Sequence, residues 1–588
     1  MEKNFMQHMC NKLCRIGLLL VALAILTQVA PAMAATYFVS PAGNDAAAGT
    51  SQGTAWKSLA KVANSALRAG DVVQLARGGV WRESLSLPSS GITLTAYGSG
   101  NAPVISGANI VSGLYAEAQS AGVTWIGSIS TQPAQVFVNG VRGQRVGSAG
   151  EVNAARKWHW SNGRLTVFWD SGSAPAVEAS LRQTVLNYNG HSNVVVDGLR
   201  IERASDTCVN MGVGNSNVLR NSVVADSFIK GVRSSGEAQH NNGRIEDNKI
   251  FGCGAEGILL DGRMTGWVVQ RNEIYNCAQL HNELVGGHAQ QEWSGAIKVW
   301  GWIKAGYVGT LTIQDNYIHD IQPQFTAGSV DHKRYVGIWL DELIDPTGRP
   351  LIARNRIVNT ASRGIFVEKS SNVDVAYNTV ERCASIQYCA GIQVEGNYGQ
   401  GAHDNHVLNN TVYGGYWGIA VKNFEASGLV NNVVRNNIAY GTKAERLYAV
   451  DGGDNNGTNG SGNVYEHNSF GPQASGFVRF GSSCSTYASL ESLYKRSMRN
   501  VEGDPRLVDP ANGDLRLKAD SPCIDAGGST FGTKDILGNA IQNGVPDVGA
   551  IEYLQGGSTD PVTPDPITPD PVTPKKYKHL VPVRSLLL

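Results

Sequence analysis

Three acidic residues recur at one position of a short motif and at a fixed distance along the chain. Asp341, Glu368 and Glu395 each end a pentapeptide, at residues 337–341, 364–368 and 391–395, so they are 27 residues apart. If each repeat forms one strand of a stack, the three carboxylates lie on neighbouring strands ~4.8 Å apart. Like charges directly opposite one another destabilise a sheet, so stability alone does not select this arrangement.

Crowded carboxylates have a specific chemical use. Their repulsion raises the pKa of one member, which leaves a protonated acid beside an ionised carboxylate. Glycosidic-bond cleavage needs such a pair, and in retaining glycosidases the two carboxyl groups are ~5 to 5.5 Å apart. We therefore expect Asp341 and Glu368 to be catalytic and Glu395 to adjust their acidity. The alternative is a solvated or cation-binding ladder of carboxylates, with loops covering the aromatic residues beside it.

The same motifs carry side chains suited to sugar binding. Exposed aromatic rings offer flat faces to sugars, whereas amide and ammonium groups hydrogen-bond hydroxyl or carboxylate groups. The predicted substrate-binding residues of this face are Lys298, Trp300, Trp339, Phe366, Gln393 and Lys422. His332 belongs to a basic stretch just before Trp339 and is expected to wall the groove.

The motif that positions these residues is a repeat with alternating apolar residues. Its copies are GILLD at 257–261, AIKVW at 296–300, GIWLD at 337–341, GIFVE at 364–368, GIQVE at 391–395 and GIAVK at 418–422. The second and fourth positions are aliphatic, so alternation sends them inward and the third and fifth outward. Such strands bury their apolar face by stacking. The period is too short for propeller blades and lacks a leucine-rich consensus.

A second recurrence supports the same architecture. The pattern Asn-x-Ile/Val begins at Asn221, Asn248, Asn272, Asn316, Asn355, Asn378, Asn410 and Asn436. Its variable spacing indicates coils of about two dozen residues with inserted loops. The fold class predicted is all-β: a right-handed parallel β-helix with an N-terminal cap and an inserted antiparallel β-hairpin subdomain.

Composition shifts divide the chain into segments. Basic residues, an apolar run and small residues near Ala34 predict a signal peptide; an uncleaved anchor is disfavoured because the run is short. The Pro/Thr/Asp-rich segment cannot build a core and is a spacer. The predicted segments are a signal peptide (1–34), cap and first coils (35–109), hairpin subdomain (110–185), β-helix core (186–470), closing coils (471–555), linker (556–574) and a short tail without assigned role (575–588).

Charge and cysteine content narrow the partners. The chain has 49 basic and 49 acidic residues, which disfavours nucleic-acid binding and polybasic membrane attachment. In an oxidising compartment, plausible disulfide pairs are Cys253 with Cys277, Cys383 with Cys389 and Cys484 with Cys523, leaving Cys208 unpaired. No cysteine spacing indicates a zinc site, and no metal is predicted.

Two of the motifs resemble a known family. GIWLD at 337–341 and GIFVE at 364–368 look like the nucleophile and acid strands of β-helical glycoside hydrolases typified by bacterial β-xylosidases. The resemblance implies that Asp341 is the nucleophile and Glu368 the general acid/base. It covers two rungs firmly and the β-helix architecture generally.

A second resemblance competes with the first. Residues 368–372, EKSSN, are similar to the Lys-Ser-x-x-Asn strand of β-helical alginate and dermatan lyases, in which Lys369 would be the base. That family places an Arg on the next coil and often uses Ca²⁺. Here the next coil has Gln393 and Glu395 instead, and in a regular strand Lys369 would point away from Glu368.

The sequence therefore predicts a secreted, periplasmic or surface enzyme that degrades a polysaccharide. We expect a glycoside hydrolase that needs no cofactor, acts as a monomer and does not enter the membrane after signal cleavage. The runner-up is a lyase or epimerase acting on a uronate polymer, with Ca²⁺. A third possibility is a non-catalytic glycan-binding adhesin displayed on the proline-rich spacer.

Overall fold

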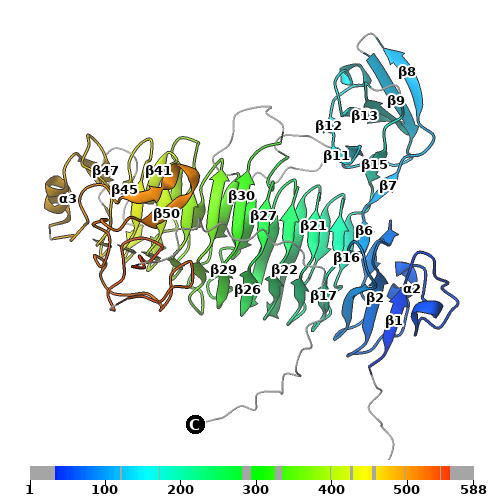
Figure 1. Cartoon of the computed structure of the whole chain (residues 1–588), viewed down its shortest axis with the longest axis horizontal. Coiled ribbons are helices and arrows are strands. Elements are labelled where there is room, and N and C mark those ends of the chain that lie inside the picture. The colour runs from blue at the N-terminus through cyan, green and yellow to red at the C-terminus, as the bar shows by residue number, and fades with distance from the viewer. Residues whose placement is uncertain are drawn as a thin grey trace, which may run out of the picture.

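The computed structural model describes residues 34–555 except 120–121, 171–172, 281–292, 325–333, 398, 424–427, 453–458, 496 and 543. The predicted signal peptide, linker and tail therefore lie almost entirely outside the described residues. Three long sheets run along one axis, and each coil of the chain contributes one short strand to each sheet (Figure 1). The predicted parallel β-helix is confirmed.

Sheets A and B form two sides of the helix. Sheet A contains β1 (Thr36–Val39), β2 (Val72–Ala76), β5 (Thr93–Tyr97), β17 (Val195–Asp197), β20 (Val218–Arg220), β23 (Arg244–Glu246), β26 (Trp267–Gln270), β29 (Leu311–Gln314), β32 (Leu351–Ala353), β35 (Asp374–Ala376), β39 (His406–Leu408), β43 (Val433–Arg435) and β46 (Val464–Glu466). Sheet B contains β3 (Val80–Trp81), β6 (Val104–Ser106), β18 (Arg200–Glu202), β21 (Val223–Ala225), β24 (Lys249–Phe251), β27 (Glu273–Tyr275), β30 (Tyr317–Ile321), β33 (Arg356–Thr360), β36 (Thr379–Glu381), β40 (Thr411–Tyr413) and β44 (Ile438–Tyr440).

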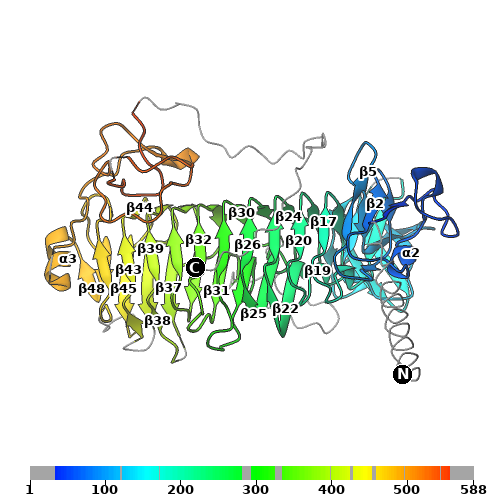
Figure 2. The same cartoon turned by 90° about the horizontal axis from the view of Figure 1, so that it is seen from below.

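Sheet C carries the repeated pentapeptides, and its strands succeed one another along the long axis (Figure 2). It contains β4 (Leu85–Ser86), β16 (Thr184–Asn187), β19 (Thr207–Asn210), β22 (Lys230–Asn241), β25 (Ile258–Thr265), β28 (Gly295–Trp300), β31 (Val336–Asp341), β34 (Ile365–Glu368), β37 (Ala390–Gly396), β41 (Trp417–Asn423), β45 (Leu447–Asp451), β47 (Val478–Phe480) and β48 (Ser482–Cys484). The predicted inward positions are fully buried, from Ile258 and Leu260 in β25 to Ile419 and Val421 in β41.

The inserted subdomain separates the first coils from the rest and projects from the N-terminal end of the β-helix (Figure 1). Its strands are β7 (Ala108–Ile110), β8 (Tyr115–Gln119), β9 (Gly122–Ser128), β10 (Val136–Val138), β11 (Val141–Arg142), β12 (Gln144–Arg145), β13 (Lys157–Ser161), β14 (Arg164–Phe168) and β15 (Val177–Ser180). Most of these strands pair antiparallel, as predicted. Arg142 docks the subdomain on the coils, donating to Gln279 Oε1 at 2.9 Å and to Ser227 O at 3.1 Å.

The ends and turns hold the remaining elements. They are η1 (Gln52–Thr54), α2 (Leu59–Ala63), η2 (Ala149–Glu151), β38 (Ala402–His403), β42 (Leu429–Val430), α3 (Tyr487–Tyr494), β49 (Leu507–Asp509), η3 (Pro510–Asn512) and β50 (Asp514–Leu517). Helix α2 covers the first coils with buried Leu59 and Val62, which closes an otherwise open sheet end. None of the helices that the structure describes is long and apolar enough to span a bilayer.

Asparagines form a buried ladder at one turn of the β-helix. Asn355 Nδ2 donates to Asn378 Oδ1 at 3.0 Å, and the same contact links the other steps. The ladder comprises Asn248, Asn272, Asn316, Asn355, Asn378, Asn410, Asn437 and Asn468. Two residues of the Asn-x-Ile/Val pattern, Asn221 and Asn436, lie outside the ladder. Ser222 rather than Asn221 occupies one position, and Asn437 rather than Asn436 another, because Asn221 and Asn436 take left-handed turn conformations.

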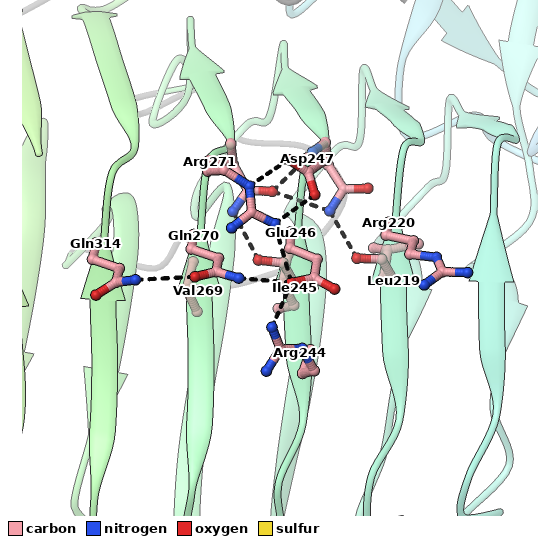
Figure 3. A network of polar contacts seen from close by, with 12 residues as sticks. Leu219, Arg220, Arg244, Ile245, Glu246, Asp247, Val269, Gln270, Arg271 and Gln314 are labelled. Atoms are coloured by element: carbon pink, nitrogen blue, oxygen red, sulfur yellow. Dashed lines mark hydrogen bonds and ion pairs between the residues drawn. The ribbon is translucent and has the colours of Figure 1, made fainter. Parts of the chain in front are cut away.

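The outward face of sheet A carries a network of ion pairs and hydrogen bonds that stabilises the β-helix. Arg271 pairs with Asp247 at 2.7 Å, while Glu246 receives Arg244 at 2.7 Å and Gln270 at 2.8 Å (Figure 3). Both carboxylates therefore lie beside cations, and Glu246 also beside an amide of the next strand. Pairing opposite charges in this way stabilises a sheet.

The predicted disulfides are wrong. All seven described cysteines are free and buried. Cys208, Cys253, Cys277 and Cys383 belong to the apolar core of the β-helix, where a thiol packs as a small apolar group.

Candidate active site

The strand register brings the three acidic residues side by side on sheet C. Asp341 is the last residue of β31 and pairs with Glu368, the last residue of β34; Glu368 pairs with Glu395 in β37. We call these residues the acidic triad. Only 2–3% of each is exposed. Three carboxyl groups therefore occupy successive rungs, ~4.8 Å apart, in a largely dehydrated place.

Two lysines hold Asp341. Lys298 Nζ lies 3.1 Å from Asp341 Oδ2, and Lys369 Nζ lies 3.9 Å from Oδ1. Among the described residues, none donates a hydrogen bond to Oδ1. Oδ2 of Asp341 is thus held by a close ion pair with Lys298. Oδ1 accepts no hydrogen bond from the described residues and lies near Lys369.

A second set of cations holds Glu395. Lys422 Nζ lies 3.3 Å and an Arg363 guanidinium nitrogen 3.8 Å from Glu395 Oε2. Gln393 Nε2 donates to the same oxygen, while Gln393 Oε1 accepts from Ala390 N at 3.2 Å. Glu395 is therefore the most firmly compensated member of the acidic triad.

Glu368, between these two, differs in acidity. Burial, followed by the neighbouring charges of Asp341 and Glu395, raises the pKa of Glu368 to about 7, although Lys369 and Arg363 oppose the shift. The pKa of Asp341 is also raised above its ordinary value by burial, although Lys298 and Lys369 oppose that shift. At neutral pH the pair can hold one proton on Glu368 beside an ionised Asp341.

The predicted aromatic platforms divide into buried and exposed rings. Trp339 and Phe366 are each only 1% exposed, so the expectation of exposed sugar-stacking faces is wrong for these two. The reason is that cations cover them. Lys298 Nζ lies 3.9 Å from the Trp339 ring centre, and the Arg363 guanidinium carbon lies 4.1 Å from the Phe366 ring centre. The rings support the cations that bind the acidic triad.

Trp300 is the predicted aromatic residue that stays exposed, at 38%. It ends β28 directly opposite Asp341 in the register. Its Nε1 donates to Glu342 Oε2 at 2.6 Å, and its ring centre lies 5.9 Å from that of Trp302. Trp300 thus offers an anchored ring one rung from the acidic triad.

Lys369 does not point away from the site as a regular strand would require. Strand β34 ends at Glu368, and Lys369 has φ of 47°, a left-handed turn conformation that reverses the side-chain direction. Lys369 Nζ reaches Glu342 Oε1 at 2.7 Å. Burial lowers the pKa of Lys369, but this ion pair and the nearby carboxylates outweigh it, and the pKa is raised overall.

Sequence reasoning missed Glu342 and Arg363. Glu342 links Trp300 to Lys369, and Arg363 links Phe366 to Glu395. Glu342 directly follows one pentapeptide and Arg363 directly precedes another. Examining the residues that flank each pentapeptide would have identified both. His332 lies outside the described residues. Among the described residues, no group of three His, Cys, Asp or Glu side chains has metal-binding geometry.

The fold and the row of outward side chains define a right-handed parallel β-helix protein: residues 184–414 match the family model described as "Right handed beta helix region". Among solved structures, the complex of XylC with xylose is similar, with a TM-score of 0.63 and 14% identity, covering 88% of this chain and 98% of that chain. A pectate lyase, Pel9A, covers 89% of this chain with 13% identity and a TM-score of 0.43.

One relative is also similar in sequence. The uncharacterized protein YwoF of Bacillus subtilis (strain 168) is 20% identical and covers 60% of this chain and 76% of its own length. The family model and the similarity to XylC support the β-helix fold alone. The chemistry must be argued from this chain's own residues.

Proposed function

We propose that this chain is a secreted glycoside hydrolase that cleaves a neutral glycan with Asp341 as nucleophile and Glu368 as acid/base. The observation that carries the proposal is the pairing of two buried carboxyl groups on adjacent strands in unlike surroundings. The similarity to a β-helix solved with bound xylose makes β-xylosides the first substrates to try.

The reaction follows from this pair. Glu368 gives its proton to the glycosidic oxygen while Asp341 Oδ1 attacks the anomeric carbon, so the leaving alcohol departs and a glycosyl ester forms on Asp341. Ionised Glu368 then takes a proton from water, whose oxygen attacks the anomeric carbon and frees Asp341. Glu395 acts as a positioning residue because its charge helps to keep Glu368 protonated.

The cations favour hydrolysis of a neutral sugar over elimination from a uronate. Lys298 is paired with Asp341, Lys369 with Glu342, and Lys422 with Glu395. A β-elimination would need a neutral base and a cation for the uronate carboxylate, whereas the raised pKa of Lys369 keeps that residue protonated. No metal ion is needed for the hydrolytic route.

The test is digestion of xylan, other neutral glycans and uronate polymers, each with and without EDTA, following reducing ends and ultraviolet absorbance together. Wild type should release reducing ends without absorbance, and Asp341→Asn and Glu368→Gln should each lose activity by at least about 10³-fold. Glu381→Gln is a matched control, because Glu381 is 1% exposed on sheet B and paired with Arg356 at 2.9 Å.

The other outcomes have definite meanings. Absorbance that EDTA abolishes would replace the proposal with a Ca²⁺-dependent lyase. Glycan binding without cleavage, unaffected by the Asp341 and Glu368 substitutions, would replace it with an adhesin.

A further inference from the structure

A polar hollow lies on sheet C some distance from the acidic triad. Its volume is about 360 Å³, and Gly190 and Gly212 leave part of its wall without side chains. We call it the β22 hollow. Its other lining residues are Asn187, Asn189, Asn210, Val213, Arg233 and Ser235. A volume of this size lies within the range of small-molecule pockets.

The β22 hollow shares an outward row with the acidic triad. Ser235 in β22 pairs with Asp261 in β25, and Asp261 pairs with Trp300 in β28, which pairs with Asp341 in β31. Three strand spacings, ~14 Å, therefore separate Ser235 from Asp341 along the axis. A ligand that reaches both must be an extended chain.

Arg233 brings hydrogen-bond donors to the hollow, since 42% of its side chain is exposed. Its Nη2 donates to Ser235 Oγ at 2.9 Å and lies 3.8 Å from Asp261 Oδ2. Asn187 Oδ1 accepts from Asn189 N at 2.9 Å, which orients the Asn187 amide. Hydroxyl oxygens are suitable acceptors for such donors.

The balance of groups favours a neutral ligand. Asp261 lies beside Arg233 and offsets part of its charge, and the remaining polar side chains of the hollow are three amides and one hydroxyl. Between the hollow and Asp341 stands the exposed ring of Trp300, whose neighbour Trp302 lies 5.9 Å away. The row thus presents hydrogen-bonding groups, then aromatic rings, then carboxylates.

We infer that the β22 hollow is a distal subsite for a neutral sugar unit of an oligosaccharide that runs along sheet C over Trp300 to Asp341. This inference rests on the proposed function for the orientation of the chain. It makes the protein selective for chains several sugars long, because a mono- or disaccharide at the acidic triad does not reach Arg233.

The experiment is calorimetric binding to the full chain carrying Glu368→Gln, which prevents turnover. The probes are xylohexaose, cellohexaose and hexagalacturonate, with xylobiose as the short ligand. A neutral hexasaccharide should bind more tightly than xylobiose. Arg233→Ala or Asn187→Ala should weaken hexasaccharide binding about tenfold and leave xylobiose binding unchanged.

The matched control is Arg244→Ala. The Arg244 side chain is 42% exposed, as is that of Arg233, and Arg244 lies in β23, the sheet A strand that follows β22 in the same coil (Figure 3). This control should change neither affinity. Melting temperatures of the three variants check that each is folded.

Each result decides one claim. Equal affinities of hexasaccharide and xylobiose, an unchanged affinity in both hollow variants, or binding of no neutral hexasaccharide would overturn the subsite. Tighter binding of hexagalacturonate than of the neutral chains would overturn the inferred neutrality. If the hollow variants weaken binding but wild type cleaves nothing, the subsite stands and the proposed hydrolase fails.

Discussion

The acidic triad differs from the sheet A cluster of Glu246 and Asp247 in how its charges are compensated. On sheet A, Glu246 and Asp247 meet arginines that are themselves solvent-exposed. On sheet C, Asp341 and Glu395 are held by cations buried against aromatic rings, and Glu368 stands between the two. Burying like charges costs stability, so the triad is best understood as a site kept for its chemistry.

The unequal acidities predict a bell-shaped pH dependence of kcat/KM. Activity should rise as pH climbs through the pKa of Asp341, which burial places above its ordinary value, because the nucleophile must be ionised. It should fall as pH passes about 7, because Glu368 then loses the proton that it donates. The two limbs belong to the coupled pair.

The two limbs of the pH profile can be assigned separately with a substrate whose leaving group needs no protonation. With an activated aryl xyloside, the Glu368→Gln variant should keep the acid limb and lose the limb near pH 7. Glu381→Gln should keep both limbs. A basic limb that persists in Glu368→Gln would assign the donated proton to another group.

Much of this site could be predicted from the sequence, because the three carboxylates occupy the same position of a repeated strand. When the repeats stack, residues at the same position become neighbours on adjacent strands. The covering of Trp339 and Phe366 was not predictable in the same way. It depends on long side chains that reach over from a neighbouring strand or a turn, such as Lys298 and Arg363, and alternation within one strand carries no information about that reach.

At the scale of elements, the Asn ladder holds one turn of successive coils together. Asn355 is fully buried; its Nδ2 donates to Ile313 O at 2.9 Å, and its Oδ1 accepts from Asn316 Nδ2 at 2.9 Å. Most residues of the ladder carry the Asn-x-Ile/Val pattern. At residues 436 and 437 only Asn436 fits the pattern, yet Asn437 lies in the ladder, because Asn436 takes a left-handed turn conformation.

Asn355→Ala should therefore lower the free energy of unfolding by about 2–4 kcal/mol, because it leaves the amide of Asn316 and the carbonyl of Ile313 buried without their partner. Chemical denaturation measures this loss. Asn153→Ala, at an exposed position, is the control and should change the value by less than about 0.5 kcal/mol. A similar effect for both substitutions would mean that the ladder contributes nothing specific.

At the scale of the whole molecule, one long segment folds back over the side of the last coils, above β44 (Figure 2). Residues 501–553 hold a separate apolar cluster that packs on Ile438. Gly549 N donates to Asn436 O at 2.8 Å, and a side chain at residue 549 would lie 2.8 Å from Ile438. The repeat disappears here, so the sequence indicated a closing segment but not where it docks.

This closing segment buries three carboxyl groups of its own. Asp535, Asp547 and Glu552 are 0–4% exposed. Asp547 N lies 3.2 Å from Glu552 Oε1, and Glu552 N lies 2.9 Å from Asp535 Oδ2. Burial, followed by the charge of Asp547, raises the pKa of Glu552 to about 8. Glu552 is therefore protonated in the docked segment at neutral pH.

Docking of the closing segment should weaken as pH rises from about 5 to 8. Because the folded-state pKa of Glu552 is raised above its unfolded value of 4.5, its contribution to stability is complete below that unfolded value and is lost as pH rises to about 8. Hydrogen exchange of residues 501–553 should accelerate between about pH 5 and 8, beyond the intrinsic pH effect that the Asn-ladder coils report. Glu552→Gln should remove this excess, since glutamine has no proton to lose. Exchange that stays equally pH-dependent in Glu552→Gln would place the titrating group elsewhere, with Asp547 and Asp535, whose pKa values burial also raises, as the next residues to replace.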